Sequence, residues 1–206
     1  MTHINTIGVG LYSDVAYSTD LTTGAWTLDK AQSLTTFTEA NWKALFQTEV
    51  AVNVAGGITG KFRRITNIRE MPQMGTPPNI VNVPNYGGKV SKQIQGQADS
   101  PTFEITMNFV PQDWITSANY LGEYVGKSSA WPFRFTLLNA DPTTSGATKY
   151  ASLTGSGLAT VQNTQYFFGG KLEALQINPQ LTDSNTAILT ISLQTELWGP
   201  FTNDMS

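Results

Sequence analysis

The chain has 206 residues and is short of charge, because Lys, Arg, Asp and Glu make up 13% of it where about 25% is usual. It has no cysteine and one histidine, His3, which excludes disulfides, thiolate metal sites and cysteine nucleophiles and nearly excludes histidine-based catalysis. We find no signal peptide over Met1–Asp14 and no membrane-length apolar run, so we expect a soluble protein made in the cytoplasm. Hydroxyl and amide side chains cost less to desolvate than charges, so this composition favours a surface covered by copies of the same chain.

The length predicts a single domain over residues 1–206, with an N-terminal arm over 1–45 and a β core over 46–206. The arm carries turn signals at its glycines and one short helix, predicted over Thr38–Phe46. The segment Met71–Gly88 holds four prolines and three glycines and therefore cannot be a central strand or a helix. A loop of this length in a compact domain is usually functional or disordered.

Alternating apolar and polar residues predict a mainly β fold. The pattern is clearest over Thr102–Val110, Trp131–Asn139 and Leu189–Leu197, and Lys89–Ala98 has one small or apolar face and one polar face. It is weaker over Lys61–Glu70, Ser152–Val161 and Tyr166–Ile177. In the last of these the alternation changes phase between Leu172 and Leu175, which predicts a β-bulge or bend.

One segment has the period of a helix instead. Between Asp113 and Gly126, apolar residues recur every three or four positions, with Asp113 as the N-terminal cap and Gly126 as the stop. We predict one flanking helix over about 113–126, with Trp114 anchoring it to the sheet by ordinary core packing.

No motif points to catalysis or to a bound cofactor or metal. Ala55–Phe62 approaches a phosphate-binding loop, but Ala55 replaces the first glycine and Phe62 replaces the Ser or Thr that would hold magnesium. Carboxylate pairs, Asp99 with Glu104 or Glu173 with Glu196, are possible across strands, and a solvated carboxylate is the favoured interpretation of each. We therefore expect no enzyme and no cofactor.

The basic residues are concentrated in one block. Six of the twelve lie within Lys61–Lys92, with Glu70 as the acidic residue there, while the flanking regions are acidic. The block either binds the phosphates of a nucleic acid or contacts the acidic parts of another copy of the chain. The overall pI near 5.1 favours the second interpretation.

The order of the strings GKFRRITNIREM and YGGKVSKQIQGQADSPTFEITMNFVPQDW, separated by the Pro-rich loop and followed by the helix, resembles the major tail tube proteins of long-tailed, siphovirus-like bacteriophages. The resemblance implies a β-barrel or sandwich of two packed antiparallel sheets with one flanking helix. It further implies hexameric rings that stack into a hollow tube, through which genomic DNA is ejected into the host.

The same resemblance implies the partners and the location. The chain would bind itself, the tail tip or baseplate, the tape-measure protein and the tail terminator, as part of the virion tail and with no membrane. Family members use a long early loop and flanking arms to contact adjacent rings. The inter-subunit and inter-ring candidates are Arg63, Arg64, Arg69, Pro77, Pro78, Ile80, Val81, Val83 and Tyr86.

Double-stranded DNA passing through a tube must not bind its wall, so the lumen should display amides, hydroxyls and isolated acids in place of Lys and Arg. Polar faces of the predicted strands meet this requirement. The lumen-facing candidates are Ser91, Gln93, Gln95, Gln97, Thr102, Glu104, Thr106, Asn108, Gln194 and Glu196. Ser192 lies on the same predicted strand face as Gln194 and Glu196.

Two alternatives remain open. One is a tube or tip component of a related contractile injection or secretion system. The other is a carbohydrate-binding β-sandwich that uses Trp26, Trp131, Trp198 and the tyrosines as stacking platforms.

Overall fold

The computed structural model describes residues 13–18, 26–33, 38, 41, 63–65, 67–73, 80–83, 92–95, 101–111, 121–138 and 163–201. Within these ranges the chain is mainly β and antiparallel, as predicted. The strands are β1 (Asp14–Tyr17), β2 (Arg63–Arg64), β3 (Ile68–Glu70), β4 (Ile80–Val83), β5 (Lys92–Gln95), β6 (Thr102–Asn108), β7 (Ala130–Leu138), β8 (Asn163–Asn178), β9 (Thr186–Leu193) and β10 (Trp198–Phe201), and the helices are α1 (Leu28–Ser33) and α4 (Leu121–Tyr124).

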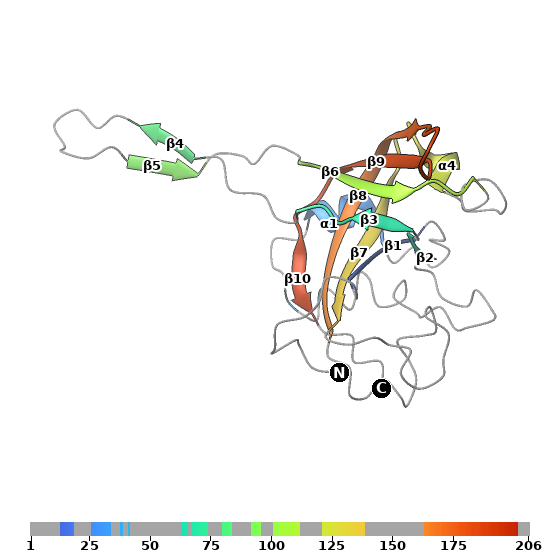
Figure 1. The fold of residues 1–206 in the computed structure, drawn as a ribbon. Coiled ribbons are helices and arrows are strands. Elements are labelled where there is room, and N and C mark those ends of the chain that lie inside the picture. The colour runs from blue at the N-terminus through green and yellow to red at the C-terminus, as the bar shows by residue number, and fades with distance from the viewer. Residues whose placement is uncertain are drawn as a thin grey trace.

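The main sheet curls into a half-barrel, called the barrel below (Figure 1). Its strands follow the order β2-β1-β7-β8-β9-β6-β3, and β2 and β3 belong to one short segment of chain. That segment joins the two ends of the sheet, because the Ile65 N–H donates to the Val15 carbonyl at 2.8 Å and the Asn108 N–H donates to the Asn67 carbonyl at 2.8 Å. Asn67 lies between the two strands with a φ of 60°, a left-handed conformation that asparagine tolerates and that bends the chain there.

The long strand β8 connects the two halves of the barrel. Its first half pairs with β7 on one side and β10 on the other, and its second half pairs with β9. The register with β9 shifts between Leu172 and Ala174, so the predicted bulge is confirmed and Glu173 is the extra residue. The bulge keeps both Leu172 and Leu175 on the side that packs against the core cluster.

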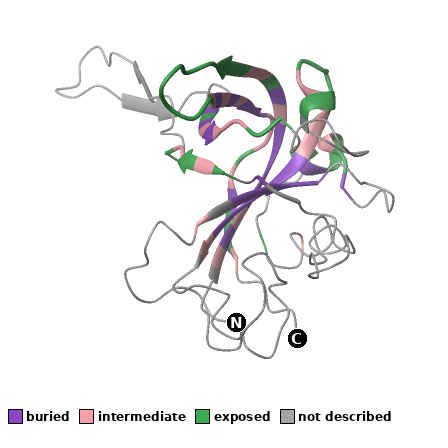
Figure 2. Ribbon diagram, turned by 45° about the vertical axis from the view of Figure 1, so that its right-hand side comes forward, coloured by how far each residue is buried: buried purple, intermediate pink, exposed green. Residues whose placement is uncertain are grey.

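Aromatic and aliphatic side chains form the core of the barrel. Figure 2 marks the buried residues along the strands of the sheet in purple. The Phe133 and Phe168 rings stack with centroids 5.3 Å apart, and Phe103 meets Phe168 edge to face at 5.4 Å. The alternation predicted along β6 is confirmed, because Phe103, Ile105 and Met107 are buried while Thr102 and Glu104 are exposed. Burying each large apolar side chain contributes about 1.5–3 kcal/mol, so this interior is the main source of stability.

A second, smaller core lies outside the barrel wall, on the far face of β1, β7 and β8. Trp26 and Ala31 of the α1 region pack there on Ala16, Phe167 and Trp198. Thr27 caps α1, since its side-chain oxygen accepts from the Lys30 N–H at 3.2 Å.

The residues of β1 and α1 do not belong to a separate N-terminal arm over 1–45, as was expected. β1 is a strand of the barrel and contributes Val15 and Tyr17 to its core, and α1 packs on its outer wall. The sequence did not indicate this because β1 spans 4 residues and α1 spans 6, too few to show a period. The start of the predicted helix at Thr38 is confirmed, because its hydroxyl accepts from the N–H of helical Asn41 at 3.2 Å.

The end of the predicted helix over 113–126 is also confirmed. α4 is helical over Leu121–Tyr124, and Gly126 follows it with a φ of 75°. The Gly126 N–H donates to the Leu172 carbonyl at 2.9 Å and so ties the helix end to β8. Trp114 and the rest of the predicted helix lie outside the described residues.

The predicted loop Met71–Gly88 contains a strand. β4 pairs with β5 in a separate two-stranded antiparallel sheet, with Ile80 opposite Gln95 and Val83 opposite Lys92. Figure 1 shows this hairpin standing well away from the barrel. The exclusion of a central strand here is therefore correct, whereas the expectation of an irregular loop is wrong for Ile80–Val83.

Candidate functional site

The outward side of β6, β9 and the second half of β8 forms one continuous polar face. Registers place Glu104 of β6 beside Thr190 of β9, and Thr190 beside Ala174 of β8. Ile188 and Ala174 are its apolar members. The polar members are Thr102, Glu104, Thr106, Asn108, Lys171, Glu173, Gln176, Asn178, Thr186, Thr190 and Ser192. We call this surface the polar face.

The bulge in β8 organises the charges of the polar face. Ser192 Oγ donates to Glu173 Oε1 at 2.7 Å, and Lys171 Nζ lies 3.3 Å from the same oxygen. The hydrogen bond from Ser192, helped by Lys171, lowers the pKa of Glu173 below its ordinary value. Glu173 is therefore ionised near neutral pH, and the charge of Lys171 is paired where it meets solvent.

Hydrogen bonds extend this network toward α1. Gln194 Nε2 donates to Ser192 Oγ at 3.1 Å, and Gln32 Nε2 of α1 donates to the Gln194 carbonyl at 2.8 Å. The polar face is thus connected to α1 by hydrogen bonds through Gln194.

The strand predicted over Leu189–Leu197 is wrong in its second half. β9 ends at Leu193, and the chain turns across β8 because the Gln194 N–H donates to the Gly169 carbonyl at 2.8 Å. The Gly169 N–H in turn donates to Thr195 Oγ1 at 2.8 Å. Gln194 and exposed Glu196 therefore lie beyond the strand, at the margin of the polar face.

The other lumen candidates fall into two groups. Thr102, Glu104, Thr106 and Asn108 lie together on the polar face, as their alternation predicted. Gln93 and Gln95 are in β5 of the separate hairpin, so the structure does not bring them to this surface. Ser91 and Gln97 lie outside the described residues.

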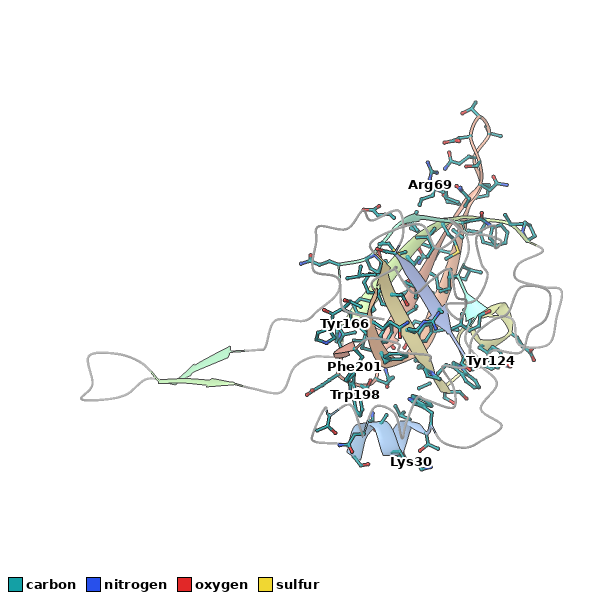
Figure 3. The ribbon with its side chains drawn as sticks, turned by 90° about the horizontal axis from the view of Figure 1, so that it is seen from below. Lys30, Arg69, Tyr124, Tyr166, Trp198 and Phe201 are labelled. Atoms are coloured by element: carbon teal, nitrogen blue, oxygen red, sulfur yellow. The ribbon has the colours of Figure 1, made fainter. Side chains whose placement is uncertain are left out.

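The inter-subunit candidates are also separated. Arg63 and Arg64 form β2, which pairs with β1, while Arg69 is exposed at the register irregularity of β3 (Figure 3). Ile80, Val81 and Val83 are in β4 of the hairpin. Pro77, Pro78 and Tyr86 lie outside the described residues.

Sequence reasoning missed six members of the polar face: Lys171, Glu173, Gln176, Asn178, Thr186 and Thr190. Thr190 was visible in the alternation of β9 and could have been included. Lys171 and Glu173 were hidden by the phase change, because a bulge puts two successive residues, Glu173 and Ala174, opposite one residue of the partner strand.

Two of the three tryptophans proposed for sugar stacking are buried, and the third packs on a tyrosine. Trp26 and Trp198 are buried in the second core, and the Trp131 ring packs edge to face on Tyr124 with centroids 4.7 Å apart. Of the carboxylate pairs, Glu173 is bound to Ser192 and Lys171, and Asp99 lies outside the described residues.

The described residues contain no group of three or more His, Cys, Asp or Glu side chains arranged to hold a metal ion. None of their helices has the length and hydrophobicity needed to cross a membrane.

The fold of the chain has likenesses among solved structures. No protein-family model matches the chain, and no curated protein matches its sequence. A solved structure, the sheath/tube terminator of the extracellular contractile injection system PVC in its extended state, superposes with a TM-score of 0.48 at 6% identity. The superposition covers 94% of this chain and 97% of that one.

Proposed function

We propose that this chain is a non-enzymatic structural subunit of a bacteriophage tail tube. Copies of it form hexameric rings that stack into a hollow tube, and double-stranded DNA passes through without specific binding. The observation that carries the proposal is the polar face: the outward side of three strands, which is rich in hydroxyl and amide groups and lies on the opposite side of the sheet from the apolar core.

The charges of the polar face suit a channel for DNA. Proteins hold DNA through Lys and Arg that displace counterions from phosphates. Lys171 is 3.3 Å from Glu173, so its charge is offset, and Glu104 is an exposed carboxylate on the neighbouring strand. Repulsion from such acids reaches only about 8 Å at physiological salt, so it keeps DNA off the wall without closing the channel.

The remainder of the fold supports self-assembly. The β4–β5 hairpin stands apart from the barrel as a two-stranded sheet, and such a sheet is at best marginally stable alone. Packing against another copy would stabilise it. The low charge of the whole chain, 13%, lowers the cost of covering its surface with copies of itself.

The competing functions receive less support. A sugar-binding surface needs exposed aromatic rings, and Trp26 and Trp198 are buried. A carboxylate-pair enzyme needs an acid that is protonated near neutral pH, whereas the pKa of Glu173 is lowered.

The proposal is tested by sedimentation of the purified protein over a range of concentrations, with negative-stain images of each fraction. Tube formation predicts a critical concentration above which hollow particles sediment. Addition of soluble glycans should leave both the critical concentration and the melting temperature unchanged. A monomer stabilised by a glycan would favour the carbohydrate-binding alternative.

A further inference from the structure

The charge of Lys171 on the polar face is offset by a carboxylate that needs support of its own. Lys171 Nζ lies 3.3 Å from Glu173 Oε1, and the two side chains are 29% and 39% exposed. Ion pairs this exposed are weak by themselves. The 2.7 Å hydrogen bond from Ser192, which is only 7% exposed, therefore does much to hold Glu173 beside Lys171.

The direction of the Ser192 bond is set by Gln194. A hydroxyl has one proton, which it can give to one acceptor at a time. Gln194 Nε2 donates to Ser192 Oγ at 3.1 Å, so the proton of Ser192 is left for Glu173 Oε1. Hydrogen bonds that follow one another in such a row polarise and strengthen each other. Glu173 is thus held by a row that begins at Gln194.

Gln194 is held in turn by two other elements. Its N–H donates to the Gly169 carbonyl of β8 at 2.8 Å, and its carbonyl accepts from Gln32 Nε2 of α1 at 2.8 Å. The Gly169 N–H donates to Thr195 Oγ1 at 2.8 Å, which fixes the next residue on the same glycine. The segment that carries Gln194 is therefore bonded both to α1 and to β8.

The second core meets this segment at the same glycine. A Cβ on Gly169 would lie 2.9 Å from Trp26 Cζ2 and 3.0 Å from Thr195 Cγ2. Trp26 and Thr195 thus approach the β8 backbone at one point, with no room for an added methyl group. Groups packed this closely transmit displacements to one another. A shift of Trp26 is therefore felt by the segment that carries Gln194.

The α1 region has the properties of an element that can leave its position. α1 spans 6 residues, which is too short for a helix to be stable alone, so it depends on its contacts in the second core. One of these contacts is imperfect: Trp26 Nε1 is buried and makes no hydrogen bond to any residue that the structure describes. Burying an unsatisfied N–H costs free energy, so α1 is docked less firmly than its apolar contacts alone would give.

We propose that the docking of α1 in the second core controls the charge of the polar face, with Gln32 and Gln194 as the positioning residues that connect the two. With α1 docked, Ser192 holds Glu173 beside Lys171, and the pair is neutral. With α1 released, the row of hydrogen bonds loses its anchor and Lys171 becomes a free cation. The inference rests on the proposed function and adds the regulation of the same surface, because DNA slides past a neutral pair and is held by a free lysine.

Variants of the two glutamines test the connection through the titration of Glu173, followed by NMR at its carboxyl carbon. Gln194→Leu removes the donor to Ser192, and Gln32→Leu removes the bond from α1, in each case without adding a charge. The pKa of Glu173 should rise toward its ordinary value in both, because the Ser192 bond is the largest cause of its lowering. Gln32→Lys keeps a donor and should restore the pKa of the parent. The control is Gln180→Leu, the same substitution at an exposed position of the β8–β9 turn.

The outcomes separate this proposal from the proposed function. A rise of the pKa in Gln194→Leu and Gln32→Leu, with none in Gln180→Leu, supports the connection. A rise in Gln194→Leu alone shows that the row ends at Gln194 and overturns the control by α1. An unchanged pKa in both variants, or an equal rise in Gln180→Leu, overturns the whole connection. None of these results depends on tube formation, which the sedimentation of the parent tests separately.

Binding of a short DNA duplex tests the effect on the polar face, at chain concentrations below those that form tubes. With one more free cation, the slope of log affinity against log salt should steepen by about 0.9 in Gln194→Leu relative to the parent. Adding Lys171→Gln to Gln194→Leu should return the slope to that of the parent. A duplex that binds Gln194→Leu with the same affinity and slope as the parent overturns the regulation.

Discussion

The Ser192 hydroxyl donates a 2.7 Å hydrogen bond to the carboxylate of Glu173, the residue that the bulge adds to β8. Ser192 is the last outward-facing residue of β9, so the bond joins two strands at the point where β8 changes register. An irregularity of the backbone thereby places an anion on the polar face and holds it beside Lys171.

Removing this bond should change the titration of Glu173. In Ser192→Ala the pKa of Glu173 should rise toward its ordinary value, because the largest cause of its lowering is gone. The measurement is an NMR titration of the Glu173 carboxyl carbon. Thr190→Ala removes a hydroxyl from the same face without touching this bond and should leave the titration unchanged. An identical pKa in Ser192→Ala and the parent would contradict the assignment.

The same bond predicts how stability depends on pH. Because the pKa of Glu173 is lower in the folded state than in the unfolded chain, its contribution is complete above about pH 4.3, the ordinary value for glutamate. The contribution disappears as the pH falls through the lower, folded-state pKa. The difference in unfolding free energy between the parent and Glu173→Gln should therefore shrink as the pH falls below about 4.3, the ordinary pKa of glutamate. Urea unfolding of both proteins across this range checks the sign.

Two neighbouring glycines should respond differently to alanine. A Cβ on Gly170 would lie 2.8 Å from Ile191 Cγ2 inside the barrel, while a Cβ on Gly169 would lie 2.9 Å from Trp26 Cζ2 in the second core. Each variant should lose about 1–3 kcal/mol of unfolding free energy through overpacking. Only Gly169→Ala should alter the fluorescence of Trp26, identified as the signal lost in Trp26→Phe. Equal spectral changes in both variants would contradict the two-core arrangement.

The hairpin should be dispensable for folding. Replacing Ile80–Gln95 by a short Gly-Ser linker removes a sheet that is separate from the barrel, so the melting temperature should stay close to that of the parent. Tube formation should be lost, because the protruding contact is gone. Tubes of normal yield from this variant would refute the role of the hairpin in stacking.

Cations on the polar face should make the tube retain DNA. Glu104→Lys combined with Thr190→Lys adds two unpaired cations at adjacent outward positions of β6 and β9. Tubes should still form, but DNA release from virions should slow, with a delay that shrinks as salt increases. The control is Glu123→Lys, at an exposed position of α4. The same delay in the control would contradict the position of the lumen.

The sequence predicted the elements in which a regular pattern continues over many residues. β6 and β7 match their alternation closely, and the phase change in β8 located the bulge. β1 and α1 were missed because each is too short for its periodic pattern to stand out from the flanking sequence. Their positions are fixed by distant contacts, such as that of Trp26 with Phe167 and Trp198, which no local window contains.

The candidate site was predicted in part for the same reason. Outward residues of β6 were identified by alternation, but their neighbours depend on register, and register is set by pairing with β9 and β8. Gln93 and Gln95 have the same polar pattern as Thr102–Asn108, yet they pair in a separate sheet. Alternation identifies a strand with two unlike faces and leaves open which sheet it joins.

The most direct test of the central claim is electron cryomicroscopy of the particles that the purified protein forms. We predict hollow tubes of stacked rings whose inner wall carries Glu104, Thr190 and Glu173. A protein that stays monomeric at every concentration, or tubes whose polar face is turned to the outside, would contradict it.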